Sequence, residues 1–101
     1  MSREEDCPDL MISVRGDVQG VGFRWWTRRL AETLGISGAV WNMPDGSVGI
    51  RAQGPREAMD RFIESLSRGP SRALVEAVDI APAPAGKHYR GFSITFGQEE
   101  E

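Results

Sequence analysis

The chain has 101 residues, of which 40% are hydrophobic, and its formal net charge at pH 7 is −3. This length fits one compact domain with a single modest core and leaves no room for a second domain. A negative net charge argues against a general nucleic-acid binder, because a phosphate backbone needs a basic surface. No stretch approaches the roughly 18 apolar residues of a membrane span, so we expect no membrane partner.

The two ends of the chain are polar and charged. Residues 1–6 carry too many charges for a signal sequence, so we expect a cytoplasmic protein. We predict a disordered leader over residues 1–8, one domain over residues 9–96 and an acidic tail over residues 97–101. The only cysteine, Cys7, has no disulfide partner, and the only histidine, His88, has no companion at ligand spacing. We therefore expect neither a metal site nor a cofactor.

Four elements are predicted in the first half of the chain. Alternation of Leu10, Ile12 and Val14 with Met11, Ser13 and Arg15 predicts a strand over residues 10–15. An amphipathic helix follows and ends before Gly35, the usual stop signal. Its apolar positions recur at intervals of three and four residues: Phe23, Trp26, Leu30, Ala31 and Leu34. Strands over residues 37–42 and 47–53 form a hairpin across the turn sequence Met43-Pro44-Asp45-Gly46.

The second half predicts a helix and two strands. The helix starts at Gly54-Pro55, with the proline at the first helical position, and ends at Gly69-Pro70. A strand is predicted over residues 73–80, and Phe92, Ile94 and Phe96 mark a last short strand. The element order is the split βαβ pattern. We predict an α+β, ferredoxin-like βαββαβ sandwich: a four-stranded antiparallel sheet, plus a short fifth strand, with two helices on one face.

Residues 16–24 join the first strand to the first helix and hold most of the functional information. Their sequence, GDVQGVGFR, has three glycines in seven positions, so the backbone can curl with its N–H groups inward. The positive end of the helix lies at the same place, and Arg24 in its first turn can hold two oxygens of one anion. The pattern predicts a site for a small phosphorylated or carboxylated molecule, although a turn that serves only packing is equally compatible with this spacing.

Two better-known phosphate-binding loops do not fit residues 16–24. The segment lacks the Gly-Lys-Ser/Thr ending that gives a nucleotide P-loop its lysine and its magnesium ligand. Its glycines follow Gly-x-x-x-Gly-x-Gly, which is not the Gly-x-Gly-x-x-Gly of a dinucleotide site. A small phosphate site without nucleotide machinery remains.

Asn42 ends the second strand, and the topology brings it to the same sheet edge as this loop. In a split βαβ unit the first two strands run in one direction with the third strand between them. The end of the second strand then lies about 10 Å from the loop, a gap that a phosphate, a water and two side chains can fill. Asparagine before Pro-Asp-Gly is also a common turn former, and that interpretation stays open.

Two motifs resemble the acylphosphatase family at the family's own spacing and in its order. They are Gly16-x-Val18-Gln19-Gly20-Val21-Gly22-Phe23-Arg24 and Gly38-x-Val40-x-Asn42-x-x-Asp45-Gly46-x-Val48. The helix start Gln53-Gly54-Pro55 and the ending Phe92-Ser93-Ile94 agree as well, so the resemblance covers nearly the whole chain and makes residues 9–96 an acylphosphatase-like domain.

The resemblance implies metal-independent hydrolysis of the carboxyl–phosphate bond of small acylphosphates. It assigns catalytic roles to Arg24, as the phosphate-binding arginine, and to Asn42, which orients the attacking water. It assigns the phosphate cradle to Gln19, Gly20, Val21, Gly22, Phe23 and Arg24. Inorganic phosphate or another anion is then expected in the loop, and we expect a monomer that binds no nucleic acid.

Three residues depart from what the family pattern or a regular strand favours. The position after Gly38 is commonly aromatic in the family and is Ala39 here, whereas Trp41 fills a variable position. Alternation places both on the sheet face opposite Val40, away from the helices, so we expect a shifted aromatic contact. Gly49 inside a strand predicts a bulge or a weakened hairpin.

Two other functions are compatible with part of this pattern. A noncatalytic anion-binding or regulatory module would use the same cradle, but loss of Arg24 or Asn42 would have indicated it, and the chain has no fused partner to serve. An RNA-binding ferredoxin-like domain would need exposed aromatic residues beside basic ones on its central strands. Trp41 is the only aromatic residue of that kind, so hydrolysis is favoured.

Overall fold

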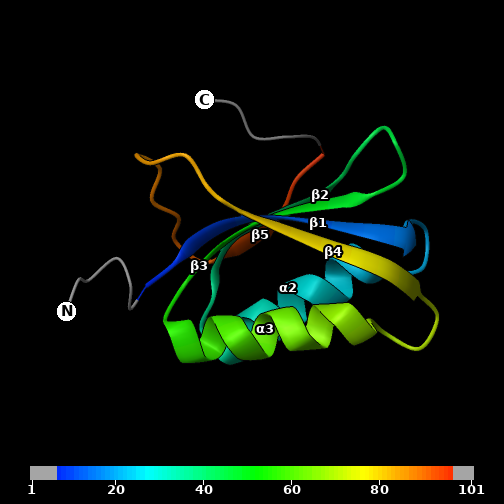
Figure 1. Cartoon of the computed structure of the whole chain (residues 1–101), viewed down its shortest axis with the longest axis horizontal. Helices are drawn as coiled ribbons and strands as arrows, with labels where there is room; N and C mark the ends of the chain where they lie inside the picture. The colour runs from blue at the N-terminus through cyan, green and yellow to red at the C-terminus, as the bar shows by residue number, and fades with distance from the viewer. Residues whose placement is uncertain (1–6, 97–101) are drawn as a thin grey trace.

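A computed structural model of the chain shows a two-layer α+β fold, with a five-stranded sheet on one side and two helices on the other (Figure 1). The structure describes residues 7–96, so most of the predicted leader and the whole predicted tail lie outside the described residues. The elements are β1 (Asp9–Asp17), α2 (Phe23–Leu34), β2 (Ser37–Asn42), β3 (Val48–Gln53), α3 (Arg56–Arg68), β4 (Leu74–Pro82) and β5 (Phe92–Ile94).

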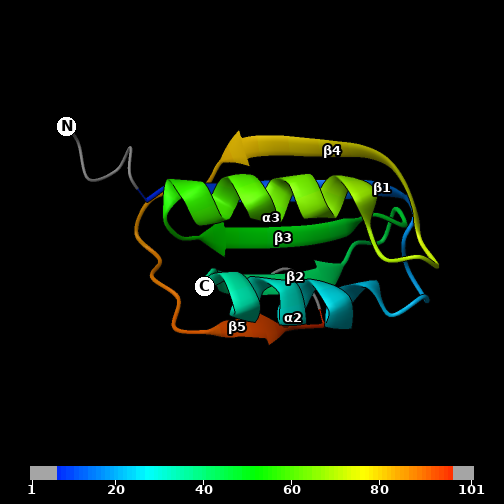
Figure 2. The same cartoon turned by 90° about the horizontal axis from the view of Figure 1, so that it is seen from below.

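The sheet order is β4-β1-β3-β2-β5, which confirms the predicted split βαβ topology. Neighbouring strands β4, β1, β3 and β2 pair antiparallel, and the short β5 adds to β2 in parallel. Both helices lie on the same face of the sheet in the two views (Figures 1 and 2). The end of β1, the start of α2 and the β2–β3 turn all meet at one end of the molecule.

Element boundaries differ from the prediction at several places; β3 begins at Val48 and not at residue 47, and β4 covers Leu74–Pro82 and not residues 73–80. β1 continues to Asp17 and shifts register against β4 between Arg15 and Gly16, where the β4 backbone leaves no room for a side chain on Gly16. Phe96 lies outside β5 and is 98% exposed, so its assignment to the last strand was wrong. Pro55 is the residue before α3, with ψ of 151°, and is not the first helical residue. Strand alternation alone cannot detect the bulge, because the apolar pattern stops before it.

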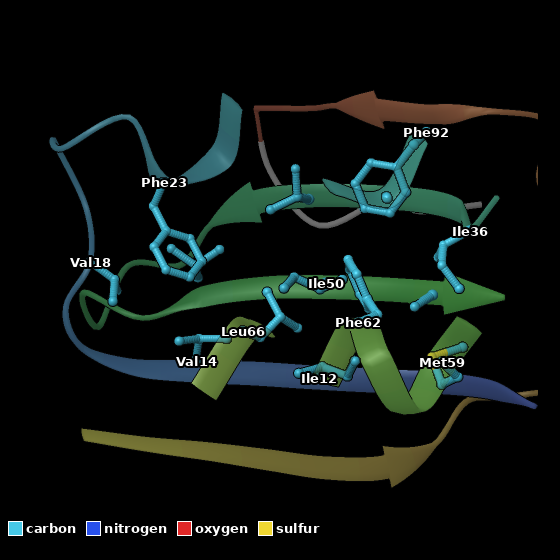
Figure 3. Close-up of a cluster of buried hydrophobic side chains, with 14 residues drawn as sticks. Ile12, Val14, Val18, Phe23, Ile36, Ile50, Met59, Phe62, Leu66 and Phe92 are labelled. Carbon is cyan, nitrogen blue, oxygen red and sulfur yellow. The ribbon is translucent and has the colours of Figure 1, made fainter. Parts of the chain in front are cut away.

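The core lies between the helices and the covered face of the sheet (Figure 3). Its central residues include Ile12 and Val14 of β1, Ile50 of β3 and Phe62 of α3, each at most 2% exposed. The predicted α2 stripe is confirmed, with Phe23 and Ala31 buried and the other members partly buried against the core, but Thr27 of that helix is also fully buried. No hydrogen-bond partner within the described part of the chain reaches the Thr27 hydroxyl.

No helix within residues 7–96 is long and apolar enough to span a membrane.

Trp41 and Gly49 pair across β2 and β3 on the sheet face that the helices leave uncovered. The β2–β3 register runs without interruption through this pair, so the bulge predicted at Gly49 was wrong. A Cβ atom on Gly49 would lie 2.6 Å from Trp41 Nε1, which shows that the glycine makes room for the indole. Trp41 is only 2% exposed, and its Nε1 donates to the sulfur of Met43 at 3.0 Å. The aromatic contact expected on this face is therefore made by Trp41 and not at the position of Ala39.

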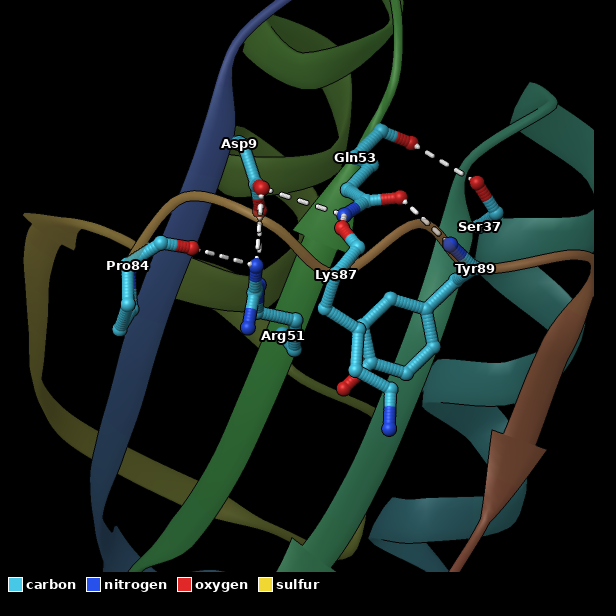
Figure 4. A network of polar contacts seen from close by, with 7 residues as sticks. All are labelled: Asp9, Ser37, Arg51, Gln53, Pro84, Lys87 and Tyr89. Carbon is cyan, nitrogen blue, oxygen red and sulfur yellow. Dashed lines mark hydrogen bonds and ion pairs between the residues drawn. The ribbon is translucent and has the colours of Figure 1, made fainter. Parts of the chain in front are cut away.

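Arg51 organises the opposite end of the same uncovered face (Figure 4). Its Nε and Nη2 donate to the two carboxylate oxygens of Asp9 at 2.7 and 2.9 Å, and Nη2 also donates to the carbonyl of Pro84 at 2.9 Å. This geometry fixes the segment after β4 across the sheet, where Gln53 accepts from the backbone N–H of Tyr89. The hydrogen bond to Asp9 raises the pKa of the Arg51 guanidinium above its already high ordinary value.

Replacement of Asp9 by asparagine tests how much this ion pair stabilises the fold. Asp9→Asn keeps the shape but leaves the buried Arg51 charge without its carboxylate, so we expect the free energy of unfolding to fall by about 1.5–3 kcal/mol. The Asp9 side chain is 31% exposed, which favours the lower half of that range. Urea denaturation measures the change.

Glu64→Gln is the matched control, because Glu64 pairs with Arg68 at 67% and 75% side-chain exposure. An exposed pair of this kind contributes about 0.5 kcal/mol or less. Equal losses in the two variants would contradict the stabilising role of the Asp9–Arg51 pair.

Candidate active site

The loop between β1 and α2 curls because two of its glycines adopt left-handed backbone conformations. Gly20 and Gly22 have φ of 80° and 79°, values that side-chain-bearing residues adopt only with strain. Gly22 is also the N-cap of α2, and it has no side chain to cap the first turn. No acidic residue occupies that turn. The first N–H groups of α2 are therefore available to donate to a ligand, and the positive end of the helix dipole lies at the same place.

A cavity of about 170 Å³ opens at this helix start. It is formed by the β1–α2 loop, the first turn of α2, the end of β2 and the end of β5. Its lining residues are Val18, Gly20, Gly22, Phe23, Arg24, Trp25, Asn42 and Ile94. The structure thus brings Arg24 and Asn42, the two predicted catalytic residues, to one cavity together with three residues of the predicted cradle.

Asn42 presents an unused acceptor at this cavity. It is the last residue of β2 and pairs with Val48, so the strand fixes its backbone. The side-chain oxygen Oδ1 is buried and accepts no hydrogen bond from any residue that the structure describes. Buried polar atoms are satisfied in the great majority of cases, so an orphaned carbonyl oxygen at a cavity indicates a place for a bound donor such as water.

Arg24 is half-buried and forms no ion pair within residues 7–96. Other arginines of the chain are matched with carboxylates: Arg15 with Asp79, and Arg28 with Glu32. An unpaired guanidinium beside a free helix start attracts an anion and can hold two of its oxygens at once. The cavity therefore combines positive charge and N–H donors on one side with a lone acceptor on the other.

The Gln19 side chain points away from the cavity and ties the loop to the β2–β3 turn. Its Nε2 donates to the backbone carbonyls of Met43 and Ser47, both at 2.8 Å. Gln19 and Val21 do not line the cavity, so their predicted part in phosphate binding stays a prediction that concerns their backbone N–H groups. The bond from Gln19 to Met43 holds the residue next to Asn42, and so fixes the two halves of the site relative to each other.

The β2–β3 turn is itself held by Asp45. Its Oδ1 accepts from the backbone N–H of Ser47 at 2.9 Å and from the Ser47 hydroxyl at 2.6 Å. These hydrogen bonds favour the carboxylate form and lower the pKa of Asp45 below its ordinary value. The turn predicted from Pro44-Asp45-Gly46 thus also supplies the backbone carbonyls to which Gln19 donates.

Sequence reasoning left out three residues that line the cavity: Val18, Trp25 and Ile94. Trp25 lies outside the apolar stripe of α2 and is 56% exposed. Its position directly after Arg24 was the available signal, because the first turn of a helix surrounds whatever binds at its start. Ile94 gave no signal, since β5 reaches the site only through its parallel pairing with β2.

A larger cavity, of about 270 Å³, lies on the uncovered sheet face beside Trp41 and Gly49. Its wall is mostly apolar, and it holds neither Arg24 nor Asn42. Within residues 7–96 no group of three or more His, Cys, Asp or Glu side chains is placed to hold a metal ion. The cavity at the start of α2 is the one that combines charge, N–H donors and an orphaned acceptor.

Comparisons with known proteins agree over nearly the whole chain. The family model described as Acylphosphatase matches residues 10–94. An acylphosphatase of Thermotoga maritima is 47% identical over 88 residues, which cover 86% of this chain and 96% of that relative. The solved structure of an acylphosphatase from Coxiella burnetii has a TM-score of 0.85 at 32% identity and covers 94% of this chain and 100% of its own. That from Bacillus subtilis has a TM-score of 0.83 at 33% identity, over 87% and 98%.

Replacement of Gln19 by glutamate tests whether its amide fixes the site. In Gln19→Glu an acceptor-only carboxylate faces two carbonyl oxygens, so the loop separates from the turn. We expect the free energy of unfolding to fall by about 1–3 kcal/mol at neutral pH and binding of inorganic phosphate to weaken. Urea denaturation and the thermal shift produced by phosphate measure the two effects.

Gln53→Glu is the matched control, because Gln53 also donates to a backbone carbonyl, that of Lys87, but at the other end of the sheet. This variant should lose stability and keep its phosphate response. If both variants respond to phosphate as the unaltered protein does, Gln19 does not position the site.

Proposed function

Because the chain belongs to the acylphosphatase family and is a hydrolase of that kind, we propose that it cleaves the carboxyl–phosphate bond of small acylphosphates without a metal. In this proposal Arg24 and the backbone N–H groups of residues 19–24 bind the phosphate. Asn42 orients the water that attacks phosphorus. The orphaned, buried Oδ1 of Asn42 at a cavity shared with Arg24 is the observation that carries the proposal.

The position of this oxygen distinguishes catalysis from simple anion binding. A carbonyl oxygen cannot donate to an anion, and beside a phosphate it is useful only when a donor lies between them. A water bound to Oδ1 is such a donor, and it lies next to the phosphorus of a ligand held by Arg24. A module that only binds anions would place another N–H or a cation there.

The residues present suit the chemistry of an acylphosphate. Phosphoryl transfer requires in-line positioning and stabilisation of charge on the equatorial oxygens, which the helix start and one guanidinium supply. The leaving group is a carboxylate, whose conjugate acid has a pKa of about 4, so it departs without a general acid. No histidine or metal-bound water is then needed at the site.

Hydrolysis takes place in one displacement at phosphorus. The water oxygen forms a bond to phosphorus while the bond from phosphorus to the carboxyl oxygen breaks, and that oxygen keeps the electron pair. The Asn42 amide is not basic, so the proton of the attacking water goes to an oxygen of the phosphate. The products are a carboxylate and inorganic phosphate.

We further propose that residues 9–96 suffice for this activity and act as a cytoplasmic monomer. The match of the family model to residues 10–94 supports the extent of this domain. A charged phosphorylated substrate does not cross a membrane unaided, which supports action in the compartment that makes it.

Replacement of Arg24 by glutamine tests the phosphate-binding role. The variant loses a charge-assisted, two-pronged contact, so we expect kcat/KM for benzoyl phosphate to fall by about 10²- to 10³-fold and phosphate inhibition to weaken. Substrate loss is followed with a chelator present. Arg28→Gln, one turn along α2 and paired with Glu32, is the matched control and should keep its activity. Absence of turnover by the folded, unaltered protein would contradict the proposed function itself.

Replacement of Asn42 by alanine tests the water-orienting role by a different kinetic signature. The phosphate contacts remain, so KM and inhibition by inorganic phosphate should change little, whereas kcat should fall by about 10²-fold or more. Ser37→Ala, at the other end of β2, is the control. Undiminished kcat in Asn42→Ala, or a fall in phosphate affinity equal to that of Arg24→Gln, would exclude this role.

A further inference from the structure

The cavity at the start of α2 has an apolar wall that phosphate binding does not use. Gly20, Gly22, Arg24 and Asn42 supply its polar groups, while its apolar lining residues are Val18, Phe23, Trp25 and Ile94. Trp25 is 56% exposed, although a tryptophan in a helix of this kind normally buries most of its ring. The neighbouring Trp26 does so by packing with Phe23, at 5.3 Å between ring centroids.

Arg29 holds the indole of Trp25 in place. The Arg29 guanidinium carbon lies 5.0 Å from the centroid of the Trp25 ring, so one side of the ring is covered by a cation–π contact. Arg29 itself forms no ion pair with a carboxylate of residues 7–96, and it is exposed. The ring therefore has a defined position at the cavity mouth, although the core does not hold it there.

A second hollow, of about 400 Å³, continues from the first along α2. The two cavities share Gly22 and Trp25, and Arg29 and Leu30 line the second. Trp25 thus stands at the passage between the phosphate cradle and an open, partly apolar surface. A ligand larger than phosphate has space to extend along this ring.

We propose that Trp25 is a specificity-determining residue that contacts the acyl group of the substrate and favours flat, apolar acyl groups over short ones. This inference rests on the proposed function. A phosphate held at the start of α2 lies against the backbone of residue 25, so the acyl group bonded to it lies within one side-chain length of the indole. Stacking of a flat acyl group on the indole is favourable, whereas an acetyl group is too small to cover the ring.

The fold does not require Trp25, which makes the proposal testable. More than half of its side-chain surface is exposed, and its one ring contact in the described residues is with Arg29, so truncation should not prevent folding. Binding of inorganic phosphate should be unaffected, because phosphate contacts only the polar part of the cavity. The predicted effect is therefore confined to the acyl group.

The experiment compares kcat/KM for benzoyl phosphate and acetyl phosphate in the unaltered protein, Trp25→Ala and Trp25→Phe. We expect Trp25→Ala to lose about tenfold toward benzoyl phosphate, the factor that corresponds to about 1.4 kcal/mol of aromatic contact, and about twofold or less toward acetyl phosphate. Trp25→Phe, which keeps an aromatic face, should recover most of the loss. Ile80→Ala, the loss of another exposed apolar side chain from β4, should change neither value.

The outcomes separate this inference from the proposed function. Equal losses toward both substrates, or no loss toward either, would overturn the role of Trp25 while turnover of benzoyl phosphate still supports the hydrolase. A changed inhibition constant for inorganic phosphate in Trp25→Ala would also overturn it, because the residue would then act on the cradle. Only failure of the unaltered protein to hydrolyse either substrate would contradict the proposed function.

Discussion

The two hydrogen bonds from the Gln19 amide to the β2–β3 turn are the contact on which the geometry of the site depends. The proposed phosphate-binding loop follows β1 and Asn42 ends β2, and these strands are not neighbours, because β3 lies between them. Sheet pairing fixes each strand, but neither the loop nor the turn is part of a strand. Gln19 connects these two irregular segments directly, at 2.8 Å to Met43 and to Ser47, and Asp45 holds the turn from the other side. In the proposed mechanism a water on Asn42 keeps its alignment with a phosphate only while both segments are held.

Rigid contacts and functional contacts lie at opposite ends of the sheet. At the start of β1, the Asp9–Arg51 pair and the carbonyl of Pro84 fix the segment after β4 across the uncovered face (Figure 4). At the end of β1 three kinds of polar group have no partner among residues 7–96: the first N–H groups of α2, the Arg24 guanidinium and the Asn42 oxygen. Unsatisfied polar groups destabilise a fold, so their concentration at one end indicates that a ligand satisfies them there.

Periodic features could be predicted from the sequence, and contacts between distant segments could not. The alternation of Ile12 and Val14 and the stripe of Phe23 and Ala31 report burial along one element, so the topology and the covered face followed from them. Gly49 was misinterpreted because its reason for being small is the indole of Trp41 on the next strand. Arg51 and Ile94 carry no local signal either. Asp9, the partner of Arg51, lies 42 residues away, and Ile94 reaches the cavity only because β5 pairs with β2. The motif predicted Gln19 as a backbone donor. The role of its side chain could not be predicted, because its partners, Met43 and Ser47, come close to it only in the folded structure.

Different residues of the cavity are proposed to carry out the reaction and to select the acyl group of the substrate. In the proposed function the phosphate-binding part is largely backbone, the N–H groups of one loop and one helix start, and backbone donors bind any acylphosphate alike. Substitution cannot tune those donors without changing the loop itself. Trp25 and Ile94 also line the cavity but have no part in the proposed phosphate binding or water orientation, so they are free of that constraint. Selectivity for the acyl group can therefore change at these positions while Arg24, Asn42 and the support from Gln19 stay as they are.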